Sequence, residues 1–247
     1  MSELINTDKL PQDVQDKFVP YARELLNLYP GRVRAAAVTG EAAGADYHPR
    51  SSQITSVFVF DEVDFQIYHQ ALKTVAAGVK KGITAPLLLS EQYLKSSLDV
   101  FPVEFLDIKE KHILIFGEDL FGGLDIKTEH LRLFCEQQVK GRMIRIRQAY
   151  LEVGLQRQGV EAMLKDSLYS LIPVFRNLVR LKGQSPAVNK EEIITQLAGA
   201  FDIDGAVLLS IFRDRSNDEK IGGQDVSVFC EKYMNELQKL ARQVDRL

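Results

Sequence analysis

The chain has 247 residues, of which 45% are hydrophobic and 26% are charged. This length fits two ordinary domains or one large one, and this composition excludes a wholly disordered chain. A formal net charge of −3 argues against a protein that coats nucleic acid, although it leaves room for a local basic stripe.

Three features of the sequence concern the location of the protein. No apolar run approaches the ~18 residues of a membrane span. The N-terminal segment is acidic and polar, unlike a signal peptide. The two cysteines, Cys135 and Cys230, lie far apart and form no zinc or redox motif. The sequence therefore predicts a cytoplasmic protein with reduced thiols and no membrane partner.

The first half of the chain mixes helical and strand patterns. Apolar spacings of three and four mark helices, whereas short β-branched or aromatic runs mark strands. The predicted elements are a helix over 12–28 capped by Thr7 or Asp8, strands over 32–39 and 54–60, a helix over 64–81, a strand over 85–89, a short helix over 90–98, and strands over 102–109 and 112–116. Glycine turns separate several of these elements, most clearly at Gly40.

From Thr128 onward the sequence predicts helices alone. The first is long, with one apolar face that steps by three and four residues. Further helices are predicted over 161–181, with a kink or break at Pro173, from Asn189, over 203–212 and over 225–244. The predicted fold class is therefore α+β, with a mixed-sheet domain over 1–126 and an all-α helical bundle over 127–247.

The most informative motif is the strand, glycine turn and strand from Val33 to Phe60. The first strand ends at Thr39-Gly40-Glu41, residues 42–52 form a turn-rich loop, and the second strand begins Gln53-Ile54-Thr55. This spacing resembles the nucleotidyltransferase fold of the polymerase-beta superfamily, in which a Gly-Gly or Gly-Ser turn precedes an Asp-hydrophobic-Asp strand. The resemblance implies two Mg²⁺ ions on strand carboxylates and a nucleotide triphosphate at the glycine turn.

The ligand positions depart from that family. Gln53 and Thr55 stand where the resemblance places two aspartates. The family's third carboxylate comes from a later strand, and Glu104 is its best match, with Asp107 as the alternative on the other strand face. One carboxylate with two neutral oxygens would hold one Mg²⁺ weakly beside a nucleotide. It would not form a two-metal catalytic clamp.

The turn itself also departs from the family, because Glu41 follows Gly40 and places negative charge where the triphosphate would lie. We therefore expect a pseudoenzyme that acts as a nucleotide-binding or protein-interaction module with a regulatory role. Its ligand would occupy a cleft between the two domains, lined by Gly40, Glu41, Gln53, Thr55 and Glu104.

The layout of the whole chain extends the resemblance. A nucleotidyltransferase domain followed by a helical bundle is similar to the kanamycin-nucleotidyltransferase-like enzymes and to antitoxin–HEPN pairs. HEPN ribonucleases carry an Arg followed by a His after four to six residues. The last histidine of this chain is His130, so the later bundle helices hold no such motif. The sequence therefore argues against a ribonuclease.

Two rival functions remain open at this stage. One is an active Mg²⁺-dependent nucleotidyltransferase with a rearranged set of carboxylates such as Glu41, Asp46 and Glu104. The other is a structural partner that forms a homo-oligomer or binds another protein through the bundle.

Two groups of side chains have both a structural and a functional interpretation. The cations around Arg132, Lys140 and Arg145 could meet phosphate. The spacing of Arg132, Glu136 and Lys140 favours ion pairs along one helical stripe, with Arg145 as the exception. For His112, at the start of a strand, we expect a surface or hydrogen-bonded position rather than metal ligation.

Overall fold

The computed structural model describes residues 3–44, 47–49, 52–215 and 225–247. The chain divides into two compact units, Met1–Lys127 and Thr128–Leu247. No helix in these described ranges is long and apolar enough to span a membrane.

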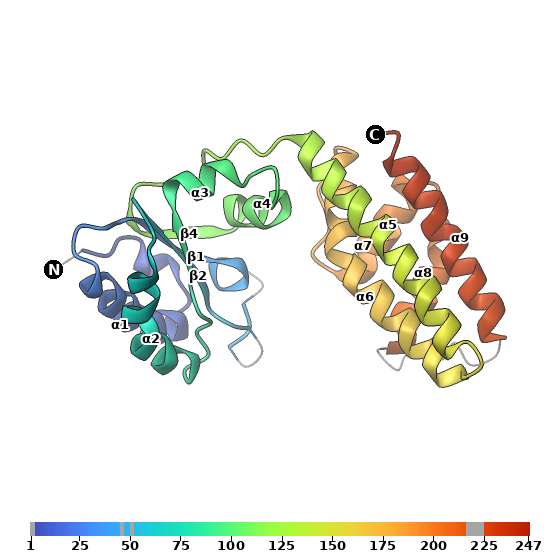
Figure 1. The fold of residues 1–247 in the computed structure, drawn as a ribbon, viewed down its shortest axis with the longest axis horizontal. Coiled ribbons are helices and arrows are strands. Elements are labelled where there is room, and N and C mark those ends of the chain that lie inside the picture. Colours follow the sequence, from blue (N-terminus) through green and yellow to red (C-terminus); the bar gives the residue numbers. More distant parts are fainter. Residues whose placement is uncertain (1–2, 45–46, 50–51, 216–224) are drawn as a thin grey trace. The chain divides into compact units, whose positions relative to one another are not determined.

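The first unit combines a four-stranded sheet with helices (Figure 1). Its elements are a 3₁₀ turn η1 (Thr7–Lys9), α1 (Gln12–Leu28), β1 (Val33–Thr39), a 3₁₀ turn η2 (Gly40–Ala43), β2 (Thr55–Phe60), α2 (Phe65–Val79), β3 (Leu87–Ser90), α3 (Glu91–Ser96), α4 (Pro102–Glu110) and β4 (His112–Gly117). Side chains cap α2 and α3, because Asp64 accepts from the Ile67 N–H and Ser90 accepts from the Tyr93 N–H. The cap expected at Thr7 or Asp8 was wrong, since α1 begins after Pro11 without a side-chain cap.

The sheet is mixed, with strand order β3-β2-β1-β4. Strand β1 is antiparallel to both β2 and β4, whereas β2 and β3 are parallel and joined by α2. This arrangement places the end of β1 beside the starts of β2 and β4. The sheet therefore has one end at which a turn and two strand starts meet.

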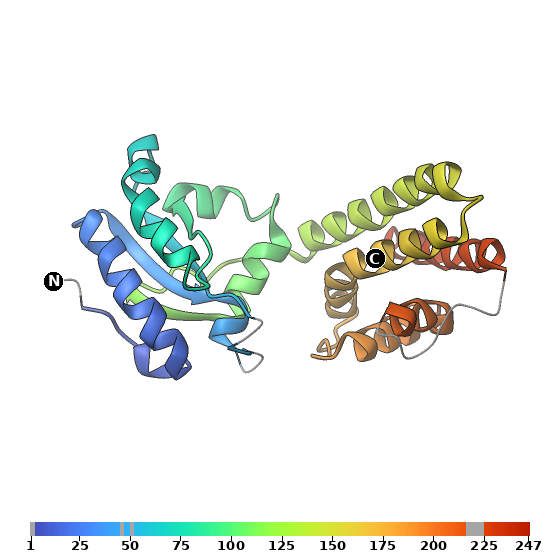
Figure 2. The same ribbon diagram turned by 90° about the horizontal axis from the view of Figure 1, so that it is seen from below.

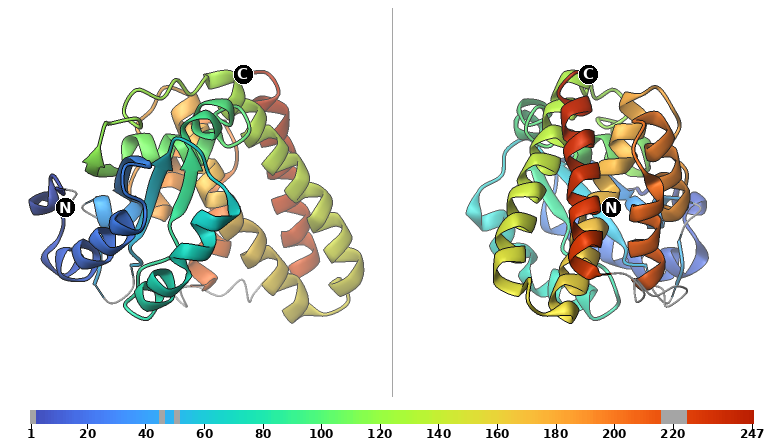
Figure 3. Two further views of the ribbon diagram at one scale, coloured as in Figure 1. Left: turned by 60° about the vertical axis from the view of Figure 1, so that its left-hand side comes forward. Right: turned by 90° about the vertical axis from the view of Figure 1, so that its right-hand side faces the viewer.

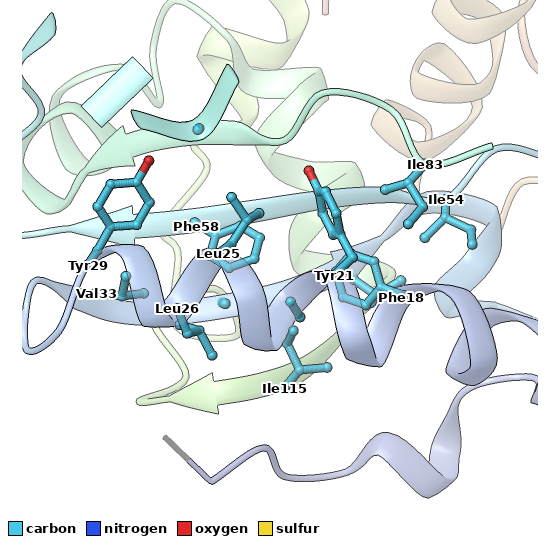
Figure 4. Packing of buried hydrophobic residues seen from close by; sticks show 14 of the residues in the cluster. Phe18, Tyr21, Leu25, Leu26, Tyr29, Val33, Ile54, Phe58, Ile83 and Ile115 are labelled. Carbon is cyan, nitrogen blue, oxygen red and sulfur yellow. The ribbon is translucent and has the colours of Figure 1, made fainter. Parts of the chain in front are cut away.

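Both faces of the sheet are covered, as Figures 1 and 2 show. Helices α1 and α2 pack on one face, where Phe18 and Leu25 of α1 meet Phe58 of β2 (Figure 4). On the other face, Ala37 and Val57 pack with Phe105 of α4. Burial on both faces explains why β1 is a continuous run of small apolar residues rather than an alternating pattern.

One predicted strand was wrong. Residues 102–109 were expected to form a strand, but Pro102–Glu110 is helix α4. Proline at the first helical position favours the start of a helix, and Phe105 and Ile108, three residues apart, both face the sheet. The short run alternates apolar and polar residues, so its periodicity did not separate the two structures. Glu104 therefore lies in the first turn of a helix.

The second unit is helical. Its helices are α5 (Thr128–Val153), α6 (Arg157–Leu181), α7 (Lys190–Ala200), α8 (Gly205–Arg215) and α9 (Val226–Val244). Helix α5 packs against α6 and α9, which lies beside it in the right-hand view of Figure 3. The predicted apolar face of α5 is confirmed at its buried members, Leu131, Cys135, Val139 and Ile146.

Helix α6 continues through Pro173, where a kink or a break was expected. One turn later, the fully buried Asn177 donates from its Nδ2 to the Pro173 carbonyl at 2.9 Å. Its Oδ1 accepts from Arg180 at 2.7 Å. The Asn177 side chain therefore links a backbone carbonyl of α6 to Arg180 on the same helix.

The ion pairs predicted along α5 are confirmed. Glu136 accepts from Arg132 at 2.8 Å and from Lys140 at 2.5 Å. Lys140 also reaches Asp245, beyond the end of α9, at 3.1 Å. These cations therefore stabilise the helical unit.

Candidate functional site

The candidate site lies at the end of the sheet where β1 stops. Thr39, the last residue of β1, pairs in register with Thr55 of β2 and with His112 of β4. Side chains alternate along a strand, so Thr39 and Thr55 lie on the same face as Ala37 and Val57, the face covered by α3 and α4. The register thus gathers Thr39, Thr55 and His112 at one place.

The two threonine hydroxyls bond to each other. Thr55 Oγ1 donates to the Thr39 carbonyl at 2.7 Å, and it lies 3.1 Å from Thr39 Oγ1. Thr39 is buried and Thr55 is half-buried. Thr55 stands where the resemblance places an aspartate, and its hydroxyl already donates a hydrogen bond to the backbone.

Gly40 turns the chain directly after this pair. Its φ of +67° lies in the left-handed region, which favours glycine, and an added Cβ would come within 3.1 Å of Thr55 Oγ1. The Gly40 N–H donates to the Lys111 carbonyl at 3.2 Å, which ties the turn to the segment before β4. The glycine expected from the motif thus has a structural requirement in this fold.

Glu41 is exposed and closes the loop that follows the turn. Its Oε2 accepts from Ser52 Oγ at 2.5 Å, and the same Ser52 Oγ accepts from the His48 N–H at 3.0 Å. The rearranged carboxylate set of Glu41, Asp46 and Glu104 stays untested, because Asp46 lies outside the described residues. The carboxylate of Glu41 thus has a structural partner within its own loop.

The other predicted site residues are Gln53, Glu104 and Asp107, which lie outside the hydrogen-bonded threonine pair. Gln53 is exposed just before β2, and by strand alternation it shares the face of Thr55. Glu104 and Asp107 are exposed on α4, which covers the same sheet face, but they are not on the strand that was expected to carry the third carboxylate. The cleft expected between the two units stays a prediction.

The donor set does not fit a pair of Mg²⁺ ions. Within the described ranges, no group of three or more His, Cys, Asp and Glu side chains is close enough to hold a metal. Two-metal phosphoryl transfer needs several carboxylate oxygens fixed close together, and the sheet end offers hydroxyls instead. The described residues therefore supply no such clamp.

His112 is the residue at this sheet end that the motif did not point to. Its Nδ1 lies 2.9 Å from the Ile108 carbonyl, and its Nε2 lies 3.2 Å from Asp119 Oδ1. The ring also packs edge-on against Phe121 at 5.4 Å. The expectation of a hydrogen-bonded histidine is confirmed. Its place beside Thr39 depends on the pairing of β4 with β1, which no local pattern reveals.

The Asp119 carboxylate makes stability depend on pH. Partial burial opposes its ionisation, but the N–H groups of Gly122 and Phe121 and the His112 ring hold its pKa below the usual 3.8. A carboxylate whose pKa is lowered by folding stabilises the folded state when the pH is above its pKa in the unfolded chain. This contribution is lost as the pH falls through its pKa in the folded chain.

We therefore expect Asp119→Asn to lower the free energy of unfolding at pH 6 by less than about 1 kcal/mol, since the carboxylate is half exposed. The difference from wild type should shrink as the pH falls through the lowered pKa of the folded carboxyl, because the protonated carboxyl is neutral like the amide. Urea titrations at several pH values measure it. A difference that stays constant down to pH 2 would contradict this assignment.

Comparison with known proteins completes the description. The sequence matches no protein-family model and no curated protein. Among solved structures, the chain is similar to a spectinomycin adenyltransferase from Enterococcus faecialis with ATP and spectinomycin. The match covers 89% of this chain and 98% of that chain, with a TM-score of 0.52 and 11% sequence identity. The chain therefore has the nucleotidyltransferase fold followed by a helical part, as the resemblance of its glycine-turn motif predicted.

Proposed function

We propose that this protein is a catalytically degenerate member of the nucleotidyltransferase fold that binds a nucleotide and acts as a regulatory module. One observation carries the proposal. Thr55 stands at a metal-ligand position of the motif, and its hydroxyl is bonded to the Thr39 carbonyl and hydroxyl. A neutral side chain engaged in this way does not replace a carboxylate as a Mg²⁺ ligand.

Nucleotide binding is supported by the features of the glycine turn that this site shares with the motif. The Gly40 turn retains its left-handed backbone, and the side chain of Lys111 lies beside Gly44 in the same turn. The neighbour in structure was solved with ATP, which adds to the argument by analogy of fold. Gln53 would then meet the ligand as a neutral hydrogen-bonding group.

The test is a thermal melt of the full chain with a panel of nucleoside triphosphates, each with Mg²⁺ and with EDTA. A ligand at about 100 times its Kd adds roughly 2.7 kcal/mol, or several degrees in the melting temperature. We expect a shift that is the same in Mg²⁺ and in EDTA. Gln53→Ala should reduce it, whereas Gln70→Ala, an exposed glutamine on α2, should not. A flat panel would overturn nucleotide binding.

Turnover is tested separately by transfer of a labelled nucleotide. We expect none, with or without divalent metal. Metal-dependent transfer that is lost in Glu104→Ala would overturn the degenerate assignment. It would support instead the active enzyme with a rearranged set of carboxylates.

A further inference from the structure

The two edge strands of the sheet, β4 and β3, differ in whether another segment of the chain covers them. At the β4 edge, the Ile5 N–H donates to the Ile115 carbonyl at 2.9 Å and Asn6 Nδ2 donates to the Leu114 carbonyl at 3.0 Å. The segment before η1 therefore covers that edge. At the other edge, β3 pairs only with β2 among the residues that the structure describes. An open edge strand is a template for pairing with another chain.

A groove runs along this open edge, with a volume of about 530 Å³. We call it the edge groove. Tyr68 of α2 stands on one side of β3 and Tyr93 of α3 on the other. The full lining is Val63, Tyr68, Pro86, Leu87, Leu88, Leu89, Ser90 and Tyr93. None of these side chains is charged, so the groove lacks the charges that usually protect an edge from association.

Helix α2 carries a second apolar face beside the groove. Its buried residues, such as Ile67 and Ala71, pack on the sheet. A different set of apolar residues is exposed and falls on one line of the helix, about 100° around from the buried set. We call this set the α2 stripe: Phe65, Tyr68, Leu72 and Val79.

The α2 stripe faces away from α1. On the α1 side of the helix, Thr74 donates to Glu24 at 2.7 Å, and Gly78 leaves room for the ring of Tyr21. On the stripe side, Tyr68 lines the edge groove. The stripe and the groove are therefore continuous, and the stripe projects on the side of the open edge.

The combined surface has the size of an interface. The stripe together with Leu87 and Tyr93 has exposed fractions between 46% and 80%. At about 150–250 Å² per large side chain, these fractions leave about 500–850 Å² of exposed surface. Monomers rarely expose more than a few hundred Å² in one patch. Each partner of a stable complex buries about 800 Å², polar rim included.

We propose that a second copy of this chain docks on this surface. The two β3 strands would pair antiparallel about a two-fold axis, and the two α2 stripes would pack against each other across the same axis. The surface then contacts its own symmetry mate, as an isologous interface requires. The residues of the stripe and of the groove lining are themselves uncharged, so the centre of this interface brings no like charges together.

The extent of the stripe favours a second copy over a foreign peptide. Phe65 and Val79 lie about 21 Å apart along the helix at 1.5 Å per residue. An extended peptide added to β3 would fill the edge groove but leave much of this stripe in water. A second copy covers both parts at once.

The first experiment measures the mass of the full chain by light scattering after gel filtration. It runs from about 1 to 100 μM, a range that brackets the Kd of a micromolar complex. We expect twice the chain mass of 27.9 kDa at the upper end. Leu72→Glu/Leu87→Lys should return the mass to that of one chain with an unchanged circular dichroism spectrum, since both positions are at least half exposed.

A matched control lies in the other unit. Leu151 on α5 is 87% exposed, so Leu151→Glu makes the same chemical change away from the proposed interface and should leave the dimer intact. A wild-type monomer at 100 μM would overturn the proposal. So would a dimer that Leu151→Glu dissociates and Leu72→Glu/Leu87→Lys does not, because the helical unit would then supply the interface.

Cross-linking tests the arrangement directly. Both native thiols are fully buried, and burial raises the pKa of Cys135 to about 12 and that of Cys230 to about 11, so they stay unreactive. Leu72 lies midway along the α2 stripe, close to the proposed axis. Mild oxidation should therefore convert Leu72→Cys into a disulfide-linked dimer and leave Leu151→Cys monomeric under denaturing conditions. Equal cross-linking of the two variants would overturn the arrangement.

Discussion

Gly117→Ala should lower the free energy of unfolding by about 2–5 kcal/mol or prevent the first unit from folding. Gly117 ends β4 with a φ of +76°, which costs a residue with a Cβ about 1–2 kcal/mol. An added Cβ would also lie 1.8 Å from the Arg34 carbonyl oxygen and 2.8 Å from its carbon. The backbone must shift to relieve such an overlap, and overpacking adds about 1–3 kcal/mol.

The close approach at Gly117 has a structural purpose. It lets the Glu118 N–H donate to the Arg34 carbonyl at 3.2 Å, just where β1 and β4 begin to pair. A shift of this backbone would disturb the strand that places His112 beside Thr39. The variant therefore tests whether the candidate site at Thr39 and His112 depends on the opposite end of the β1–β4 pair, where Gly117 lies.

Gly31→Ala is the matched control. Gly31 has nearly the same φ, +73°, but an added Cβ meets nothing within 4 Å. This substitution should cost only the backbone term of about 1–2 kcal/mol. Urea unfolding followed by circular dichroism gives the free energies, and hydrogen exchange at β1 and β4 shows whether the first unit is affected. Equal losses in the two variants would show that the contact with Arg34 has no cost.

Local patterns predicted most elements of this fold. The spacing of apolar residues placed α1 over residues 12–28, and short apolar runs located β1, β2 and β4 within one residue at either end. These features follow from short-range periodicity and from turn residues such as Gly40, which the backbone itself requires. The glycine turn followed by a strand after a fixed loop also pointed to the fold.

The errors arose where tertiary context decides. Residues 102–110 form a helix because Phe105 and Ile108 can pack together on the sheet, and the sequence alone does not show that this sheet face is free. His112 joins Thr39 only through the β4 to β1 pairing, although β2, α2, β3, α3 and α4 lie between β1 and β4 in the sequence. The open edge at β3 likewise follows from strand order. A site built from strand register is therefore harder to predict than the strands themselves.

Gln53→Asp/Thr55→Asp should convert the sheet end into a metal-dependent structure. Without metal, the aspartate at position 55 would place an acceptor where the Thr55 hydroxyl now donates to the Thr39 carbonyl at 2.7 Å. The loss of this half-buried donor and the negative charge close to the carbonyl should lower the free energy of unfolding by about 1–3 kcal/mol. Gln53 is exposed, so its replacement should add little of its own.

Mg²⁺ should then restore this loss in the double variant alone. Two carboxylates two residues apart share a strand face, which suits them to bind one ion, and saturation at about 100 times Kd adds roughly 2.7 kcal/mol. Thermal melts with Mg²⁺ and with EDTA measure the effect.

Thr55→Ser, which keeps the donor, should match wild type and show no response to metal. If wild type responds to Mg²⁺ as strongly as the double variant, its own residues already form a metal site, and the proposal of a degenerate centre falls. If only the double variant responds, the side chains at positions 53 and 55 alone account for the difference between this sheet end and a metal-binding site.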